Sequence, residues 1–381
     1  MKKIVTIIGA RPQIIKSAAL SRAIKKHFST SITEIIVHTG QHYDENMSQV
    51  FFDELGIPAP NYNLNVGSGS HGKQTAIMIS GIEEILLNEK PDAIILYGDT
   101  NSTLAGAIAA SKIHVPIIHI EAGLRSFNKS MPEEVNRIMC DHVSTLLFSP
   151  TQTGFENLIR EGFQPDAQIP YHANNPKIYH SGDVMYDNSL FFSEFAETNT
   201  SIIQDNDLEK GKFILATIHR NNNTDEPVRL NALFNALYKI IENNSVDVLL
   251  PLHPRTEKLL EQNLNQELYQ KIKSNTHFKI IKPVSFIEMI ALEKHCSIVI
   301  TDSGGVQKEA FYFKKPCVIL RPETEWVELV NCGTAIIADA DEQKIIEAFN
   351  TLISKSSMQF PDIYGDGKTA EFICKEILNH F

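Results

Sequence analysis

Short apolar runs alternate with longer amphipathic stretches from one end of the chain to the other. In the first half the apolar runs occur at residues 4–8, 34–37, 93–96, 117–120, 145–148 and 177–180. Most of these runs are separated by enough chain to form a helix, which is the connection that parallel strands require. The pattern predicts a doubly wound parallel sheet with helices on its faces.

The alternation is interrupted once and then starts again. Residues 190–211 are polar and acidic, which is typical of an interdomain linker. Further apolar runs follow at residues 213–216, 246–250, 278–281, 298–300 and 317–320. Because 381 residues exceed what one core usually serves, we expect two Rossmann-like domains at residues 1–190 and 191–368. We expect them to face a central cleft, and a last helix at 369–381 to pack back on the first domain.

Composition narrows the class of protein. The formal net charge is −11, and 43% of the residues are hydrophobic, so the chain is typical of a globular protein without a basic nucleic-acid surface. It contains no run of eighteen apolar residues. The five cysteines lack metal or redox spacing, and the histidines form no tight metal-ligand pair. We therefore expect a cytoplasmic protein that uses no metal and binds neither nucleic acid nor membrane.

Charged residues gather directly after the apolar run at 115–118. Three carboxylates and two arginines fall within seventeen residues; they are Glu121, Glu133, Glu134, Arg125 and Arg137. Ligands of open α/β sheets bind at the carboxyl ends of the strands, so Glu121 lies where chemistry is expected. The alternative is structural: Glu133 and Glu134 would complement a helix dipole, with Arg137 as a helical partner.

Ionisable residues also follow the other predicted strands. In the first domain they are Arg11, Lys16 and Asp99, and in the second they are His219, Arg220, His253, Asp302 and Arg321. Ionisable groups therefore follow the strands of both domains, and five of them, Arg11, Lys16, Arg220, His253 and Arg321, supply positive charge. This positive charge suits a nucleoside diphosphate better than a bare phosphate.

The segment Asp302, Ser303, Gly304 and Gly305 precedes a helical stretch and looks like a phosphate cradle. Glycine lets the backbone approach a ligand closely, and the free N–H groups of a helix N-terminus favour an anion. Glu309 follows one turn later, where it can accept hydrogen bonds from ribose hydroxyls. The alternative is a tight strand-to-helix turn that needs glycine only for steric reasons.

Taken together, these segments closely resemble one family, the non-hydrolysing UDP-N-acetylglucosamine 2-epimerases. The resemblance rests on seven motifs in the family's order, at residues 9–16, 97–100, 119–125, 132–137, 219–220, 251–254 and 301–305. It implies two Rossmann-like domains similar to those of GT-B glycosyltransferases, usually in a homodimer. It also implies inversion of C2 of a UDP-linked 2-acetamido sugar without a redox cofactor, in the synthesis of surface polysaccharide precursors.

The resemblance further assigns roles to individual residues. Those matching the family's catalytic groups are Asp99, Glu121, Glu133 and His219. Arg11, Lys16 and Arg137 match positions used for charge stabilisation and substrate contacts. Ser303, Gly304, Gly305 and Glu309 would hold the diphosphate and the ribose. Two other enzyme classes remain open: a hydrolysing epimerase that releases N-acetylmannosamine, and a GT-B glycosyltransferase.

The chain departs from the common family pattern in two places. Where Thr-Glu-Arg-Pro-Glu is usual, residues 324–328 read Thr-Glu-Trp-Val-Glu, so an arginine near the diphosphate is lost. Residues 41–44 and 73–75 keep only part of the set that binds an activating second UDP-N-acetylglucosamine. These variants resemble the subgroup that acts on UDP-2,3-diacetamido-2,3-dideoxyglucuronate. Both sugars remain candidate substrates, and the uronate is slightly favoured.

Overall fold

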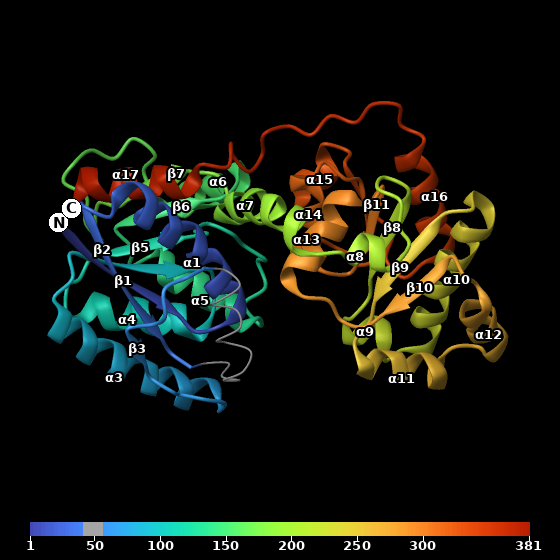
Figure 1. The fold of residues 1–381 in the computed structure, drawn as a ribbon. Coiled ribbons are helices and arrows are strands. Elements are labelled where there is room, and N and C mark those ends of the chain that lie inside the picture. The colour runs from blue at the N-terminus through green and yellow to red at the C-terminus, as the bar shows by residue number, and fades with distance from the viewer. Residues whose placement is uncertain (41–55) are drawn as a thin grey trace. The chain divides into compact units, whose positions relative to one another are not determined.

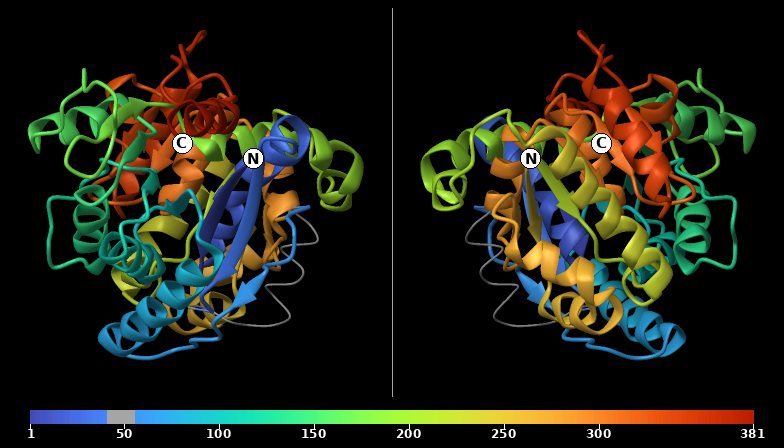
Figure 2. Two further views of the ribbon diagram at one scale, coloured as in Figure 1. Left: turned by 90° about the vertical axis from the view of Figure 1, so that its left-hand side faces the viewer. Right: turned by 90° about the vertical axis from the view of Figure 1, so that its right-hand side faces the viewer.

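The computed structural model describes residues 1–40 and 56–381. The chain forms two compact units: Met1–Asn188 with Asp362–Phe381, and Ser189–Pro361. Each unit contains one parallel β-sheet with helices on both faces (Figures 1 and 2). The predicted fold class of two Rossmann-like parallel-sheet domains is confirmed.

The sheet of the first unit has seven strands in the order β3-β2-β1-β4-β5-β6-β7. Their bounds are β1 Lys2–Ile8, β2 Ile32–His38, β3 Tyr62–Asn63, β4 Ala93–Tyr97, β5 Ile117–Ile120, β6 Leu146–Ser149 and β7 Lys177–His180. Every residue of β4 is buried. Because helices cover both faces of the sheet, such strands are continuous apolar runs and do not alternate with polar residues.

Helices connect these strands and cover the sheet. They are α1 Arg11–Ala23 with the π-helical turn Ile24–Phe28, α3 His71–Glu89, α4 Asn101–Lys112, α5 Pro132–Asp141, α6 Gln152–Arg160 and α17 Thr369–His380. α3 and α4 share a core cluster with Val5, Ile7 and Leu96. α17 returns from the end of the chain and contacts α1. Both termini therefore belong to the first unit (Figure 1).

The second unit has six strands in the order β10-β9-β8-β11-β12-β13. Their bounds are β8 Phe213–Thr217, β9 Asp247–Pro251, β10 Phe278–Ile281, β11 Ile298–Thr301, β12 Cys317–Ile319 and β13 Ala335–Ile337. The helices are α8 Ile202–Asp205, α9 Asn221–Thr224, α10 Pro227–Asn244, α11 Pro254–Asn263, α12 Gln266–Ser274, α13 Phe286–His295, α14 Gly304–Tyr312, α15 Val327–Asn331 and α16 Glu342–Ile353.

In each sheet, the direction in which successive strands are added reverses at one pair of adjacent strands. In the first unit the strand order runs outward in both directions from β1 and β4, and in the second from β8 and β11. The carboxyl ends at such a reversal are where open α/β sheets bind ligands. The topology thus singles out the segments after these four strands.

The predicted linker at residues 190–211 begins next to the boundary between the two units, which lies between Asn188 and Ser189, but much of it is helical. α7 spans Val184–Asn199 and crosses the boundary between the units, and α8 follows at Ile202–Asp205. Phe192 and Ala196 are 1% and 2% exposed, and the Phe192 ring lies 5.3 Å from that of Phe286. A few apolar side chains on one helix face are therefore enough to anchor a segment whose overall composition is polar.

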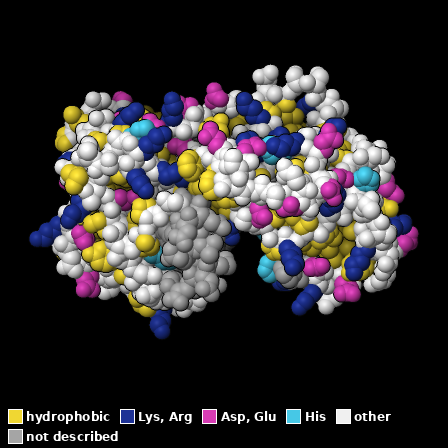
Figure 3. Space-filling view, in the orientation of Figure 1, with side chains coloured by type: hydrophobic (Ala, Val, Ile, Leu, Met, Phe, Trp, Pro, Cys, Tyr) yellow, Lys and Arg dark blue, Asp and Glu magenta, His cyan; other side chains and the backbone are white. Residues whose placement is uncertain are grey.

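The surface carries charges of both signs, and the helices are those of a globular fold. Acidic and basic side chains are interspersed over the face shown in Figure 3. Over residues 1–40 and 56–381, no helix has both the length and the apolar character needed to cross a membrane.

Candidate active site

The carboxyl edge of the first sheet holds residues that follow β1, β4 and β5. α1 starts shortly after β1, and Lys16 lies in its second turn. Asp99 follows β4 after one intervening residue, and Glu121 follows β5 directly. Because β1, β4 and β5 are adjacent strands, their ends bring these three side chains to one place.

Asp99 is bound by Arg137 from α5, whose Nη2 donates to the Asp99 carboxylate. The Nη1 of Arg137 lies 3.2 Å from an oxygen of Glu134, which is 1% exposed. Glu134 in turn accepts the backbone N–H groups of Ser126 and Phe127, each at 2.9 Å. Burial would raise the pKa of Glu134, but these hydrogen bonds and Arg137 lower it on balance. Glu134 is thus an ionised anchor that holds Arg137 against Asp99.

The three predicted catalytic carboxylates act on one another. Burial raises the pKa of Asp99 in spite of the nearby Arg137 and Lys16, and the charges of Glu121 and Glu133 raise it further. Glu133 lies exposed in the first turn of α5. A carboxyl whose pKa is raised keeps its proton closer to neutral pH and suits acid catalysis.

Glu121 has an unusual backbone conformation. Its φ of +72° lies in the left-handed region that residues other than glycine seldom adopt. The N–H groups of Glu121 and Ala122 both donate to the carbonyl of Phe148 at 3.0 Å, which holds this turn in place. Strain of this kind is concentrated at functional sites.

The Glu121 side chain accepts a hydrogen bond from Lys16, and the pair packs on Gly98. A Cβ at Gly98 would lie 3.0 Å from Glu121 Oε2 and 3.3 Å from Lys16 Nζ. The φ of Gly98 is also positive, at +61°. A side chain at position 98 would therefore disturb both the turn after β4 and the Lys16–Glu121 pair.

A buried network of hydrogen bonds and ion pairs, formed by His119, Asp141 and Arg125, holds this edge of the sheet in place. His119 Nδ1 lies 2.6 Å from Asp141, and its Nε2 lies 2.8 Å from the carbonyl oxygen of Gly98. Arg125 binds the other Asp141 oxygen at 2.7 Å. Burial would lower the pKa of His119, but Cys140 and Asp141 outweigh it and raise the pKa well above its ordinary value. The charged imidazole can donate on both sides, tying the β4 and β5 ends to α5.

In the second unit, the predicted residues gather around Asp302, which directly follows β11 and is 0% exposed. Its carboxylate accepts the backbone N–H of His219 at 3.1 Å, that of Arg220 at 3.0 Å and the Asn223 amide at 3.1 Å. The His219 ring also lies 3.1 Å from Asp302, yet 55% of its side chain stays exposed. Asp302 therefore fixes the segment after β8 and leaves the His219 ring accessible.

The predicted cradle forms the start of α14. Ser303 is the N-cap residue, and Gly304 and Gly305 provide the first helical N–H groups. A carboxylate oxygen of Glu325 lies 2.8 Å from Arg321 Nη1. The other oxygen would lie 2.5 Å from a Cβ on Gly304. A carboxylate of the chain itself thus lies beside the first residue of α14 and neutralises Arg321.

The remaining predicted residues lie at the same two edges. Glu309 is half-buried in α14, and Arg11 and His253 are exposed at the starts of α1 and α11. Gln74, from the expected activator set, accepts a hydrogen bond from the Asn101 amide at 2.9 Å. Residues 41–44 of that set lie outside the described residues. Within the described ranges, no group of three or more His, Cys, Asp or Glu residues could hold a metal ion.

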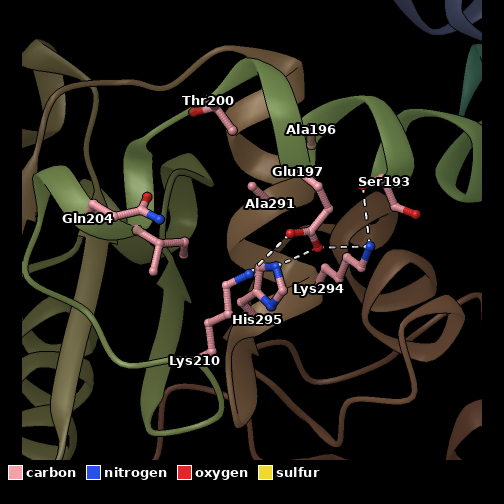
Figure 4. Close-up of a pocket in the computed structure, with 10 residues that line it drawn as sticks. Ser193, Ala196, Glu197, Thr200, Gln204, Lys210, Ala291, Lys294 and His295 are labelled. Atoms are coloured by element: carbon pink, nitrogen blue, oxygen red, sulfur yellow. Dashed lines mark hydrogen bonds and ion pairs between the residues drawn. The ribbon is translucent and has the colours of Figure 1, made fainter.

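A small pocket of about 30 Å³ lies in the second unit, away from the predicted residues (Figure 4). Glu197 lies at its centre, 3.0 Å from Lys294, 3.1 Å from Lys210 and 2.8 Å from His295. The hydrogen bond from Lys294 is the largest cause that lowers the pKa of Glu197, to about 2. The pocket is just large enough for a water molecule, so we interpret this charge cluster as structural.

Comparison with known proteins gives consistent matches along the whole chain. The family model described as UDP-N-acetylglucosamine 2-epimerase matches residues 23–378. The chain is 48% identical to UDP-2,3-diacetamido-2,3-dideoxy-D-glucuronate 2-epimerase of Pseudomonas aeruginosa, over 98% of this chain and 99% of the relative. It is also 48% identical to a UDP-N-acetylglucosamine 2-epimerase homolog of Methanococcus maripaludis, over 99% of each.

Solved structures agree with the sequence matches. UDP-GlcNAc 2-epimerase of Methanocaldococcus jannaschii is 39% identical, with a TM-score of 0.85 over 99% of both chains. A second structure of that protein, in complex with UDP-GlcNAc and UDP, gives a TM-score of 0.80 at 40% identity, again over 99% of both chains. The chain therefore belongs to the UDP-N-acetylglucosamine 2-epimerase family.

Proposed function

We propose that this protein inverts C2 of a UDP-linked 2-acetamido sugar without net hydrolysis, and that the sugar is 2,3-diacetamido-2,3-dideoxyglucuronate. The observation that carries the reaction is the meeting of Asp99, Glu121 and Glu133 at one sheet edge beside Lys16 and Arg137. The uronate is favoured by residues 324–328. Relatives with either sugar in their names are 48% identical to this chain. UDP-N-acetylglucosamine is the second candidate substrate.

The reaction needs several acid and base groups. The C2 proton is not adjacent to a carbonyl, so direct abstraction would be slow. In the proposed route UDP leaves C1 as the C2 proton is removed, which yields a 2-acetamidoglucal. UDP then adds back to C1 while C2 is protonated from the opposite face. One carboxylate cannot serve both faces, and the raised pKa of Asp99 supports it as a group that carries a proton.

In this proposal the second unit holds the leaving group. His219, Arg220 and Arg321 supply positive charge and hydrogen bonds to the diphosphate, while Ser303, Gly304 and Gly305 supply the start of α14. Glu309 accepts the ribose hydroxyls, and Arg11 and His253 add contacts at the two edges. Stabilisation of the departing diphosphate would be the largest single contribution to the rate. The UDP complex of the Methanocaldococcus jannaschii relative supports the assignment of UDP.

We also propose that the enzyme is a cytoplasmic homodimer. All five cysteines are free thiols, which supports a reducing compartment. The dimer rests on the family resemblance. Sedimentation velocity tests it, because a species of one chain at all micromolar concentrations would contradict it.

Proton NMR in deuterated water tests the reaction and the sugar together. UDP-2,3-diacetamido-2,3-dideoxyglucuronate and UDP-N-acetylglucosamine are each incubated with the enzyme. We expect loss of the H2 signal and a new manno-type anomeric signal, faster with the uronate. Stoichiometric release of UDP with a free sugar would instead indicate the hydrolysing reaction. Transfer to an added acceptor with the donor H2 retained would indicate a glycosyltransferase.

The carboxylate variants give the first testable prediction. We expect Asp99→Asn, Glu121→Gln and Glu133→Gln to fold normally and each to lose on the order of 10²–10⁴-fold in turnover, because acid or base assistance is removed. The matched control is Glu156→Gln, which removes an exposed carboxylate paired with Arg160 and should retain the wild-type rate. Near-normal turnover in all three site variants would contradict the proposed mechanism.

A further inference from the structure

Trp326 is the only tryptophan of the chain, and it stands where the common family pattern has an arginine. The side chain is buried, with 7% of its surface exposed. Its indole N–H donates to the carbonyl oxygen of Gly304 at 2.9 Å. Gly304 is the first residue of α14 and belongs to the proposed diphosphate cradle. Trp326 therefore connects the segment before α15 to the start of α14.

Three further contacts fix the position of the indole. The backbone N–H of Trp326 donates to the Thr324 hydroxyl at 3.1 Å, and this hydroxyl donates to Oε1 of Gln307 at 2.6 Å. The ammonium group of Lys308 lies 4.1 Å from the centroid of the Trp326 ring, which is a cation–π distance. Gly304 and Lys308 are four residues apart and so share one face of α14. The indole spans this face.

Anchoring the Gly304 carbonyl also fixes the N–H group that follows it. The peptide group between Gly304 and Gly305 is planar and trans, so its C=O and the N–H of Gly305 point in opposite directions. Trp326, which binds the carbonyl, is buried, whereas Gly305 is exposed. The first N–H groups of a helix have no partner within it, and two successive glycines restrain the backbone little. The indole thus sets the direction of an exposed hydrogen-bond donor.

We propose that Trp326 is a positioning residue for diphosphate recognition: its indole N–H holds the Gly304–Gly305 peptide so that the Gly305 N–H is directed at the diphosphate. This inference rests on the proposed assignment of UDP to the second unit. Trp326 touches no phosphate itself. Because the donor is directed before the ligand binds, less free energy is lost in ordering the cradle. A directed backbone N–H thus takes the place of the arginine in the common pattern.

The single tryptophan makes a precise test possible. Biosynthetic replacement of tryptophan by benzothienylalanine changes residue 326 alone; sulfur replaces the indole N–H, and the ring keeps its size and its face toward Lys308. Isothermal titration calorimetry on the full-length protein measures the Kd of UDP directly and that of uridine by displacement of UDP. We expect UDP to bind roughly three- to tenfold more weakly, the contribution of one hydrogen bond, and uridine to bind as before.

Two variants accompany the replacement. Trp326→Phe also lacks the donor but keeps an aromatic ring, so it should lose affinity for UDP and not for uridine. Leu329→Ala removes a side chain of α15 that is 1% exposed, three residues further along the chain. It is the matched control for lost packing and should keep the wild-type ratio of the two affinities.

The outcomes separate the two proposals. If the wild type does not bind UDP, the proposed function fails, and the inference fails with it. If the wild type binds UDP and the benzothienylalanine protein keeps the full preference for UDP over uridine, only the positioning role is overturned. If the replacement weakens both ligands equally, or if Leu329→Ala reduces the preference as much, the effect is one of packing and the role is again overturned. A loss confined to UDP in both donor-free proteins supports it.

Discussion

Among single residues, Glu325 places its carboxylate at the start of α14, which is the proposed diphosphate site. It pairs with Arg321 at 2.8 Å and lies against the start of α14. UDP would have to displace it. We therefore expect Glu325→Gln to bind UDP about two- to fivefold more tightly, because an exposed pair of this kind contributes under about 1 kcal/mol.

Calorimetric titration of UDP at low and high salt checks this expectation. The gain should shrink as salt increases, since the competing charge is screened. Glu323→Gln removes an exposed acid two residues away and should change the affinity little. Weaker UDP binding in Glu325→Gln would mean that the carboxylate positions Arg321 for the ligand instead of competing with it.

Residues of the candidate site were predictable where they lie within two residues of the end of a strand. Asp99, Glu121 and His219 were predictable because a parallel sheet places such positions at its ligand-binding edge. Asp141 and the buried role of Glu134 were not, because acids within an amphipathic helical stretch look like a solvated face. Both are buried, at 0% and 1% exposed, and only the tertiary structure shows which side of α5 faces His119 and Arg137. Asp302 was noted as part of the cradle, but its role in holding His219 depends on β8 and β11 being adjacent.

Among the elements, α17 has its N-terminal N–H groups bound by a carboxylate of the first unit. Asp187 accepts the backbone N–H of Thr369 at 3.2 Å and that of Ala370 at 2.8 Å. Burial raises the pKa of Asp187 from 3.8 to about 6, against the effect of these hydrogen bonds. The folded state thus binds a proton more tightly than the unfolded state, so the contribution of Asp187 to stability falls as pH rises from about 4 to about 6.

The variant Asp187→Asn tests this pH dependence. As pH rises from about 4 to about 6, the free energy of unfolding of the variant should increase relative to that of the wild type by up to about 3 kcal/mol. The difference between the two free energies should be constant above and below this window. Urea unfolding of both proteins at a series of pH values measures it. A difference that does not change with pH would show that Asp187 has the same pKa in the folded and unfolded states.

The prediction of elements succeeded where apolar runs were long. The strands of four to seven residues near the centre of each sheet were predicted within a residue or two. β3 has two residues, which is too short for a recognisable run, and pairing with β2 defines it. β13 was not predicted, although β12 has the same length of three residues and was. The helices within the predicted linker were missed because the average polarity of residues 190–211 obscured the few apolar positions through which α7 and α8 are anchored.

For the whole molecule, the end of the chain stabilises the unit in which the chain begins. α17 buries Ala370, Ile373, Cys374 and Ile377 at 0–3% exposure and contacts α1. Deletion of residues 369–381 should lower the stability of the first unit by roughly 5 kcal/mol, from the apolar area exposed. The second unit should be unaffected.

Differential scanning calorimetry with hydrogen exchange would resolve the effect of the deletion. Exchange should accelerate in α1 and not in α10, and only the transition assigned to the first unit should move. Removal of Phe381 alone serves as the control. Equal loss in both units would show that they unfold as one cooperative system, and the prediction of a local effect would be wrong.

The chain leaves the first unit after Asn188 and returns at Asp362, so the second unit is in effect an insertion. The exit and the return are held close together, because the Asp183 N–H donates to the Tyr364 carbonyl at 3.0 Å. A domain whose two ends lie close together can be exchanged as one piece. Chimaeras that exchange residues 189–361 between this protein and a relative named as a UDP-N-acetylglucosamine 2-epimerase would retain both crossing points. The sugar preference of each chimaera would then follow whichever unit recognises the sugar.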